Sequence, residues 1–201
     1  MSEHYFTSSP TAAAQERPRS FLIRGREHAV TTAGAVFSPN HLDRGTQVLL
    51  DHVPDPPATG ILLDLGCGWG PIALALADAA PDATVLAVDV NERAVDLAAR
   101  NASAAGLGNI RALLADDLLA ELRGSATVDL IWSNPPVRIG KEALHSLLLT
   151  WLALLSDNGE AWFVVQKNLG ADSLMAWLNS QGWNATRAAS SRGFRVLHVH
   201  R

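Results

Sequence analysis

The sequence predicts an α/β fold built on one open, mostly parallel sheet with helices on both faces. Four short and nearly continuous apolar runs, at residues 61–65, 84–88, 128–132 and 161–165, have the composition of strands buried on both faces. Segments with the three- and four-residue spacing of amphipathic helices alternate with these runs. Alternation of this kind produces a doubly wound sheet, whose ligands bind at the carboxyl ends of the strands.

The 201 residues fit a single domain, because no linker rich in Pro, Gly or Ser divides them. Residues 1–20 are mostly polar or small, so we expect a flexible N-terminal tail followed by one domain over residues 21–201. The tail lacks the apolar stretch of a secretory signal, and no segment has the roughly 20 apolar residues that cross a bilayer. A single cysteine, Cys67, is typical of a reducing compartment. We therefore expect a cytoplasmic protein with no membrane segment.

The net charge of -4 and the isoelectric point near 5.9 argue against a protein whose whole surface binds nucleic acid. Any contact with RNA is expected to be local. Arginines are concentrated at two places, although ordinary solvated side chains explain them equally well: Arg17, Arg19, Arg24 and Arg26 before the predicted core, and Arg187, Arg192, Arg195 and Arg201 at its end.

A glycine-rich loop follows the first apolar strand, in the sequence Asp64-Leu-Gly-Cys-Gly-Trp-Gly70. Glycine at alternate positions permits a tight turn and lets a ligand approach the backbone. A dinucleotide fingerprint requires its third glycine at position 71, where this chain has Pro71. The loop therefore favours a nucleotide-like ligand other than NAD, with a purely structural turn as the alternative.

Acidic residues follow the next two strands. Asp89 ends the strand at 84–88 and is placed to accept hydrogen bonds from both hydroxyls of a ribose, or to interact with the N-terminus of a helix capped by Asn91. We expect the third strand at 109–115, after which Asp116 can accept an adenine amino proton, a role that Asp117 can also fill. Asp64 is expected either to orient the loop amides or to meet an ammonium group.

The strand at 128–132 is followed by Asn134-Pro135-Pro136. An amine conjugated to a heteroaromatic ring is a poor nucleophile, and hydrogen-bond acceptors help it by drawing its nitrogen toward a tetrahedral shape. The Asn134 side-chain oxygen and the Pro135 carbonyl can both accept from an NH₂ group, and proline rigidity holds them in place. The motif thus predicts methyl transfer to a planar nitrogen, with a simple strand-ending turn as the alternative.

The remaining elements complete the sheet. Apolar residues from Leu144 to Leu155 form a helical stripe that we expect Asn158-Gly159 to terminate. Asp172 is expected to cap a helix that stops at Gly182. Residues 185–189 and 194–199 are expected to form an antiparallel hairpin.

The glycine loop and the acids after three successive strands resemble class I S-adenosylmethionine-dependent methyltransferases. The resemblance implies a Rossmann-like sheet of seven strands with the last one antiparallel, and S-adenosylmethionine as cofactor. It assigns cofactor binding to Asp64, Gly66, Cys67, Gly68, Gly70, Asp89, Val90, Asp116 and Asn134. Cys67 is not expected to be a nucleophile, because no histidine or second cysteine lies nearby in the sequence.

Five further segments resemble the ribosomal RNA small subunit methyltransferase C family, which methylates guanine N2. They are residues 31–38, 42–46, 134–141, 166–167 and 193–195. The larger members carry an additional degenerate methyltransferase-like half, so this chain resembles the catalytic half alone. The resemblance implies ribosomal RNA or the small ribosomal subunit as partner, with Asn134, Pro135 and Pro136 as catalytic residues.

One position departs from the pattern of many Asn-Pro-Pro methyltransferases, which have an aromatic residue next to stack on the base, whereas this chain has Val137. We expect Phe37, with Trp69 behind it, to supply stacking, unless these are ordinary packed aromatics. Arg138 and Lys141 are expected to contact RNA phosphates, or else to be solvated residues at a helix start.

Two other functions compete with guanine methylation. A protein glutamine amide and an adenine N6 amine present the same planar NH₂, and a methyltransferase-like fold can also serve as a non-catalytic binding module. No metal site is predicted, because the seven histidines lack metal-ligand spacing.

Overall fold

The computed structural model describes residues 16–34, 36, 41–122 and 127–201. Its strands are β1 (Glu16–Ile23), β2 (Arg26–Ala33), β3 (Ile61–Leu65), β4 (Thr84–Asp89), β5 (Ile110–Leu114), β6 (Val128–Ser133), β7 (Leu155–Gln166), β8 (Asn184–Ser191) and β9 (Phe194–His200). Its α-helices are α1 (Arg44–His52), α2 (Pro71–Ala79), α3 (Glu92–Ala104), α4 (Ala115–Glu121), α5 (Lys141–Leu152) and α6 (Ala171–Ser180). Short 3₁₀ turns follow two of the strands, at Val137–Ile139 and Lys167–Leu169.

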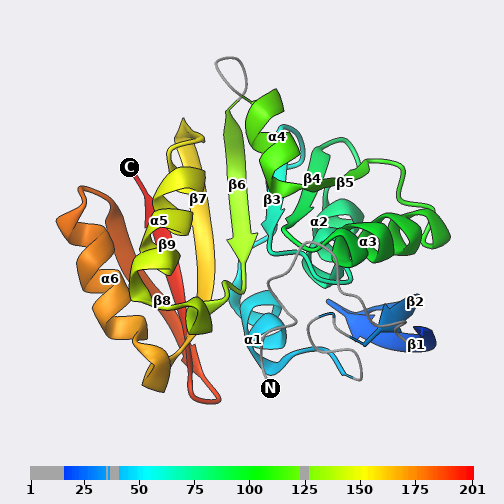
Figure 1. Ribbon diagram of the computed structural model, residues 1–201, viewed down its shortest axis with the longest axis horizontal. Helices are drawn as coiled ribbons and strands as arrows, with labels where there is room; N and C mark the ends of the chain where they lie inside the picture. The colour runs from blue at the N-terminus through cyan, green and yellow to red at the C-terminus, as the bar shows by residue number, and fades with distance from the viewer. Residues whose placement is uncertain (1–15, 35, 37–40, 123–126) are drawn as a thin grey trace.

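Seven strands form one sheet in the order β5-β4-β3-β6-β7-β9-β8 (Figure 1). Parallel pairing joins β5 through β7, and β9 runs antiparallel to both of its neighbours. The predicted fold, with its antiparallel last strand, is therefore confirmed. The chain builds β3, β4 and β5 outward in one direction and then returns to place β6 on the other side of β3. Strand order reverses between β3 and β6, which is where a ligand site is expected in such sheets.

The two faces of the sheet bury separate apolar clusters. Alternate residues of a strand enter opposite clusters, as Leu62 and Leu63 of β3 show, because successive side chains point to opposite faces. Helices α1, α2 and α3 pack on one face, and α4, α5 and α6 pack on the other (Figure 1). Burial on both sides explains why these strands are continuous apolar runs.

The β1–β2 hairpin was not expected from the sequence. It pairs Glu16–Ile23 with Arg26–Ala33 in antiparallel register, and Ile23, Val30 and Ala33 join the core cluster on the α1–α3 face. The predicted tail over residues 1–20 is therefore wrong for residues 16–20, which belong to β1; residues 1–15 lie outside the described part of the chain.

Two predicted helix ends also differ from the structure. Helix α5 ends at Leu152, and Leu155 begins β7, so Asn158-Gly159 lies within a strand and not at a helix terminus. Helix α6 begins at Ala171 after Gly170, which places Asp172 in the first turn and not at the cap. Asn91 is an N-cap as predicted, since its side chain accepts from the Arg93 N–H. Among the described residues, no helix is long and apolar enough to cross a membrane.

Candidate active site

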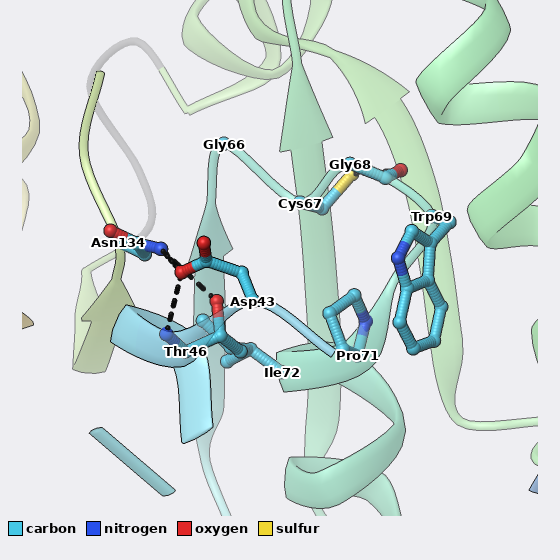
Figure 2. A pocket seen from close by; sticks show the side chains of 9 residues that line it. All are labelled: Asp43, Thr46, Gly66, Cys67, Gly68, Trp69, Pro71, Ile72 and Asn134. Carbon is cyan, nitrogen blue, oxygen red and sulfur yellow. Dashed lines mark hydrogen bonds between the residues drawn. The ribbon is translucent and has the colours of Figure 1, made fainter. Parts of the chain in front are cut away.

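The glycine loop and the Asn-Pro-Pro motif lie side by side at the carboxyl edge of the sheet. Leu65 and Ser133 are register partners at the ends of the parallel strands β3 and β6, and the Ser133 hydroxyl donates to the Leu65 carbonyl at 2.6 Å. The two motifs begin at the next residues, Gly66 and Asn134. Together with the start of α1 they line an open pocket (Figure 2).

Nine residues line this pocket: Asp43, Thr46, Gly66, Cys67, Gly68, Trp69, Pro71, Ile72 and Asn134. The set contains four of the predicted cofactor-binding residues, namely Gly66, Cys67, Gly68 and Asn134.

The glycine loop is held by backbone hydrogen bonds to the end of β4. The amides of Gly66 and Cys67 both donate to the Val88 carbonyl at 2.9 Å. Gly66, Gly68 and Gly70 have φ values of 78°, 56° and 94°, which side chains rarely adopt. A Cβ atom on Gly66 or Gly68 would meet no heavy atom within 4 Å, so both glycines border open space. The loop thus presents bare backbone to the pocket.

Asp89 braces the loop from the end of β4. One carboxylate oxygen accepts from the Gly68 amide and the other from the Asn91 amide, each at 3.0 Å. Burial raises the pKa of Asp89, although these amide bonds oppose the shift. Asp89 is half-buried as a residue, and each of its carboxylate oxygens has a further lone pair that can accept from a ligand.

Asp64 lies beneath the loop and not in the pocket. It is fully buried, and its Oδ2 accepts from the Ala73 amide in the first turn of α2 at 2.9 Å. Its Oδ1 is buried without a hydrogen-bond partner among the described residues. Burial raises the pKa of Asp64 to about 8, the nearby Asp89 charge adding to the effect. Of the two roles predicted for Asp64, the geometry fits orientation of backbone amides, although the amide belongs to α2.

The other predicted cofactor residues have different surroundings. Cys67 is buried, and burial raises the pKa of its thiol, which disfavours the nucleophilic thiolate. Gly70 packs against Ala98 of α3, since a Cβ there would lie 3.3 Å from the Ala98 Cβ. Val90 is 46% exposed just after Asp89. Asp116 is exposed in the first turn of α4.

The side-chain amide of Asn134 is held in one orientation. Its Nδ2 donates to Asp43 Oδ2 at 2.7 Å and lies 3.1 Å from the Thr46 hydroxyl oxygen (Figure 2). An ionised carboxylate only accepts, so the nitrogen must face Asp43. The amide nitrogen makes both contacts. Oδ1 is therefore the atom of the Asn134 side chain that is left to accept from a ligand.

The two prolines form a tight turn after Asn134. The Pro135 carbonyl accepts from the Val137 amide at 2.8 Å, and Pro136 has φ -74° and ψ 72°, which are the angles of an inverse γ-turn. The Pro135 carbonyl thus already has one partner within the chain. A carbonyl oxygen has a second lone pair, so it can still accept from a ligand amine.

The predicted substrate-contacting residues are only partly placed. Phe37 lies outside the described residues. Trp69 lines the pocket, but its side chain is only 2% exposed and its ring stacks on Phe21 of β1 at a centroid distance of 5.1 Å. Its position is that of a packed aromatic. Arg138 and Lys141 are exposed just beyond the proline turn.

The sequence reasoning missed three residues that organise the site: Asp43, Thr46 and Asn101. Asp43 is the N-cap of α1 and accepts from the Thr46 amide at 3.0 Å. Asn101 is buried in α3, and its Nδ2 donates to the carbonyls of Trp69 and Thr31 at 2.8 and 3.0 Å. The Asp-x-x-Thr spacing was a visible capping signal, whereas nothing local marked Asn101. Within the described ranges, no cluster of three or more His, Cys, Asp or Glu residues can hold a metal.

Comparison with known proteins begins with the family model for the methyltransferase small domain, which matches residues 27–198. Uncharacterized protein YbxB of Bacillus subtilis (strain 168) is 34% identical over 197 residues, 98% of both chains. Ribosomal RNA small subunit methyltransferase C of Shewanella sp. (strain MR-4) is 38% identical over 118 residues, 59% of this chain and 33% of that protein.

Ribosomal RNA large subunit methyltransferase G of Streptomyces avermitilis is 31% identical over 174 residues, 85% of this chain and 44% of that protein. This chain therefore spans 33% to 44% of the length of these two named relatives. Among solved structures, the T. thermophilus 16S rRNA N2 guanine methyltransferase (RsmC), in complex with AdoMet and guanosine, matches with a TM-score of 0.78. That match has 23% identity and covers 96% of this chain and 52% of the other, and it shows a shared fold.

Proposed function

Because this chain belongs to the methyltransferase small domain family, whose cofactor is S-adenosylmethionine, we propose that it methylates the exocyclic N2 amine of a guanine in small-subunit ribosomal RNA. The observation that carries the proposal is the fixed orientation of Asn134, because Asp43 holds its side-chain nitrogen and leaves its oxygen as the atom that can accept from a ligand.

The residues present fit the cofactor. Gly66 and Gly68 border open space at the backbone, and the half-buried Asp89 holds the loop through the Gly68 amide. We assign cofactor contact to this loop, to Asp89 and to the exposed Val90, with Asp64 supporting the loop from below through α2. When bound, S-adenosylmethionine supplies a methyl group activated by a sulfonium.

The acceptor side of the pocket supplies positioning and electrostatics. Asn134 Oδ1 and the Pro135 carbonyl accept from the amine hydrogens, which localises the nitrogen lone pair for attack. These acceptors strengthen as positive charge develops on the nitrogen, so they favour the transition state over the ground state. No strong general base is needed, because the nitrogen becomes acidic once it carries the charge.

Ribosomal RNA as substrate is supported by the named relatives, which are ribosomal RNA methyltransferases. The target base must leave its stack to reach the pocket, so a single-stranded or partly assembled RNA is the expected substrate. Arg138 and Lys141 are exposed beyond the proline turn, where point charges can contact phosphates.

A second candidate substrate is large-subunit ribosomal RNA. The large subunit methyltransferase G match covers 85% of this chain, whereas the small subunit methyltransferase C match covers 59%. The two candidates require the same pocket and differ only in the RNA that presents the base.

Transfer of labelled methyl groups tests the proposal. The purified protein is incubated with labelled S-adenosylmethionine and, separately, with small subunits, large subunits, naked ribosomal RNA or cell protein, and the Asn134→Ala variant is the control. We expect label in small-subunit RNA that digests to N2-methylguanosine. Label in large-subunit RNA would support the second candidate, and label only in protein or in N6-methyladenosine would contradict guanine methylation.

A further inference from the structure

We propose that Asp43 is a positioning residue for methyl transfer, which orients the Asn134 amide and increases the negative charge on its Oδ1. The proposal rests on the proposed function, since it assigns a role toward the same acceptor amine. Asp43 itself acts through Asn134 and not on the reacting atoms.

A single oxygen of Asp43 joins two elements that are far apart in the sequence. Its Oδ2 accepts from the Thr46 amide at 3.0 Å, which caps α1, and from Asn134 Nδ2 at 2.7 Å, at the end of β6. Figure 2 shows the three side chains meeting at the pocket wall. The helix cap therefore fixes the position of the Asp43 carboxylate. The carboxylate in turn fixes the orientation of the Asn134 side-chain amide.

The packing around this junction leaves no space for a side chain at Gly45. A Cβ atom on Gly45 would lie 2.9 Å from Asp43 Oδ2, 3.1 Å from Asn134 Nδ2 and 3.1 Å from the Phe194 ring. Gly45 is buried, so the absence of a side chain there lets α1 approach β6 and β9 closely. A side chain at position 45 would therefore collide with the Asp43–Asn134 contact.

The charge of Asp43 has an electronic consequence as well. A hydrogen bond from an amide N–H to a carboxylate is charge-assisted and stronger than a neutral one. Such a bond polarises the amide, because hydrogen bonds in a chain strengthen one another. Electron density moves toward Oδ1, which makes it a better acceptor for an amine that becomes positive in the transition state.

Asp43→Ser separates this role from helix capping. Serine and aspartate are equivalent N-caps, so the variant keeps the cap but loses the carboxylate that reaches Asn134. We expect unchanged unfolding midpoints, S-adenosylmethionine affinity within about threefold by calorimetry, and a kcat about ten- to a hundredfold lower, the usual size for loss of a hydrogen bond to a charged group. The control Asp51→Ser makes the same change at an exposed position of α1 and should retain wild-type kcat.

A double-mutant cycle tests whether Asp43 works through Asn134. In the Asn134→Ala background, Asp43→Ser should lower kcat no further, since the amide it positions is gone. Full additivity of the two losses, or wild-type kcat in Asp43→Ser alone, would overturn the proposal. The cycle is measured with whichever acceptor the wild-type protein methylates. If that acceptor is not guanine, the guanine proposal fails but the cycle still tests Asp43, so the two failures give different results.

A readout without substrate completes the test. In NMR spectra of the wild-type protein, the Asn134 side-chain proton bonded to the carboxylate should resonate downfield of ordinary amide protons. The Asp43→Ser spectrum should lose this shift while the Asp51→Ser spectrum keeps it. An Asn134 resonance that is the same in all three proteins would overturn the proposal.

Discussion

At the scale of single residues, Asn134 connects the sequence motif to chemistry. Its oxygen is proposed to interact with the amine most strongly when the nitrogen carries charge, and Asn134 lines the pocket beside the glycine loop. We predict that Asn134→Ala preserves S-adenosylmethionine affinity within a few-fold and lowers turnover by roughly 10²-fold or more, the scale of losing one transition-state hydrogen bond. Calorimetry and labelled methyl transfer measure the two effects. Wild-type turnover in this variant would remove the role assigned to Asn134.

Asp64 makes the stability of the protein depend on pH. Its pKa of about 8 in the folded chain lies above the value of about 3.9 expected when unfolded, because burial disfavours the charged form. Between these values the folded chain keeps a proton that the unfolded chain releases. The contribution of Asp64 to stability is therefore present below pH 4 and is lost as pH rises toward 8.

We predict that the Asp64→Asn variant loses less stability than the wild type as pH rises toward 8. Between pH 5 and 8 the free energy of unfolding of the wild type should fall relative to that of the variant, by on the order of 1 kcal/mol per pH unit. Urea denaturation at several pH values measures the difference. Asp116→Asn, which changes an exposed residue of α4, should follow the wild-type curve. Parallel curves for wild type and Asp64→Asn would show that the buried carboxyl is already ionised.

At the scale of elements, Asn101 connects three of them. From helix α3 it exchanges hydrogen bonds with the Thr31 backbone in β2 at 2.7 and 3.0 Å, and it donates to the Trp69 carbonyl in the glycine loop. The β1–β2 hairpin, which also stacks Phe21 on Trp69, is thereby tied to the glycine loop. We infer that the hairpin stabilises the loop conformation.

Asn101→Ala is predicted to lower both stability and cofactor affinity. Leaving the Thr31 amide and the Trp69 carbonyl without partners should cost about 1–3 kcal/mol in the free energy of unfolding. Because the loop loses its support, S-adenosylmethionine should also bind more weakly in calorimetry. Asn179→Ala is the matched control, since Asn179 bonds α6 to Ala185 on the other face of the sheet. It should lower stability alone, and equal cofactor affinities in the two variants would contradict the coupling.

Elements differed in how far the sequence predicted them. All seven strands of the main sheet were predicted, because burial on both faces imposes apolar runs that are visible locally. Strand β1 was not, since only Ile23 is buried in it and its other residues have the composition of a solvated tail. The start of β7 was predicted to be part of a helix, because Leu155 continues the apolar spacing of α5. Its strand conformation depends on pairing with Val128 of β6, which is distant in the sequence.

At the scale of the whole molecule, the net charge of -4 means that the proposed RNA substrate must be attracted locally. Arg138 and Lys141 are the cations that the sequence places next to the acceptor motif, and both are exposed. If they contact phosphates, each contributes a salt-dependent term to RNA affinity that is independent of base identity.

We predict that Arg138→Ala and Lys141→Ala each weaken RNA binding and reduce the slope of log affinity against log salt by about 0.7 for a single-stranded site. Fluorescence titrations at several salt concentrations measure the slope. Arg111→Ala removes an exposed cation that pairs with Glu121 on β5 and α4, away from the acceptor motif, and should leave the slope unchanged. The same slope change in all three variants would indicate nonspecific attraction.

The sequence by itself determined the fold class, the glycine loop and the Asn-Pro-Pro turn, because each depends on residues close together in the chain. Buried strands must be apolar, a bare-backbone turn must be glycine, and a rigid acceptor turn uses proline. The tertiary structure alone decided how these parts are held. The partnership of Asp43 with Asn134 spans 91 residues and that of Asn101 with Thr31 spans 70, so no local pattern records either. Only folding brings such side chains within hydrogen-bond distance, and it thereby determines which atom of Asn134 is held by Asp43.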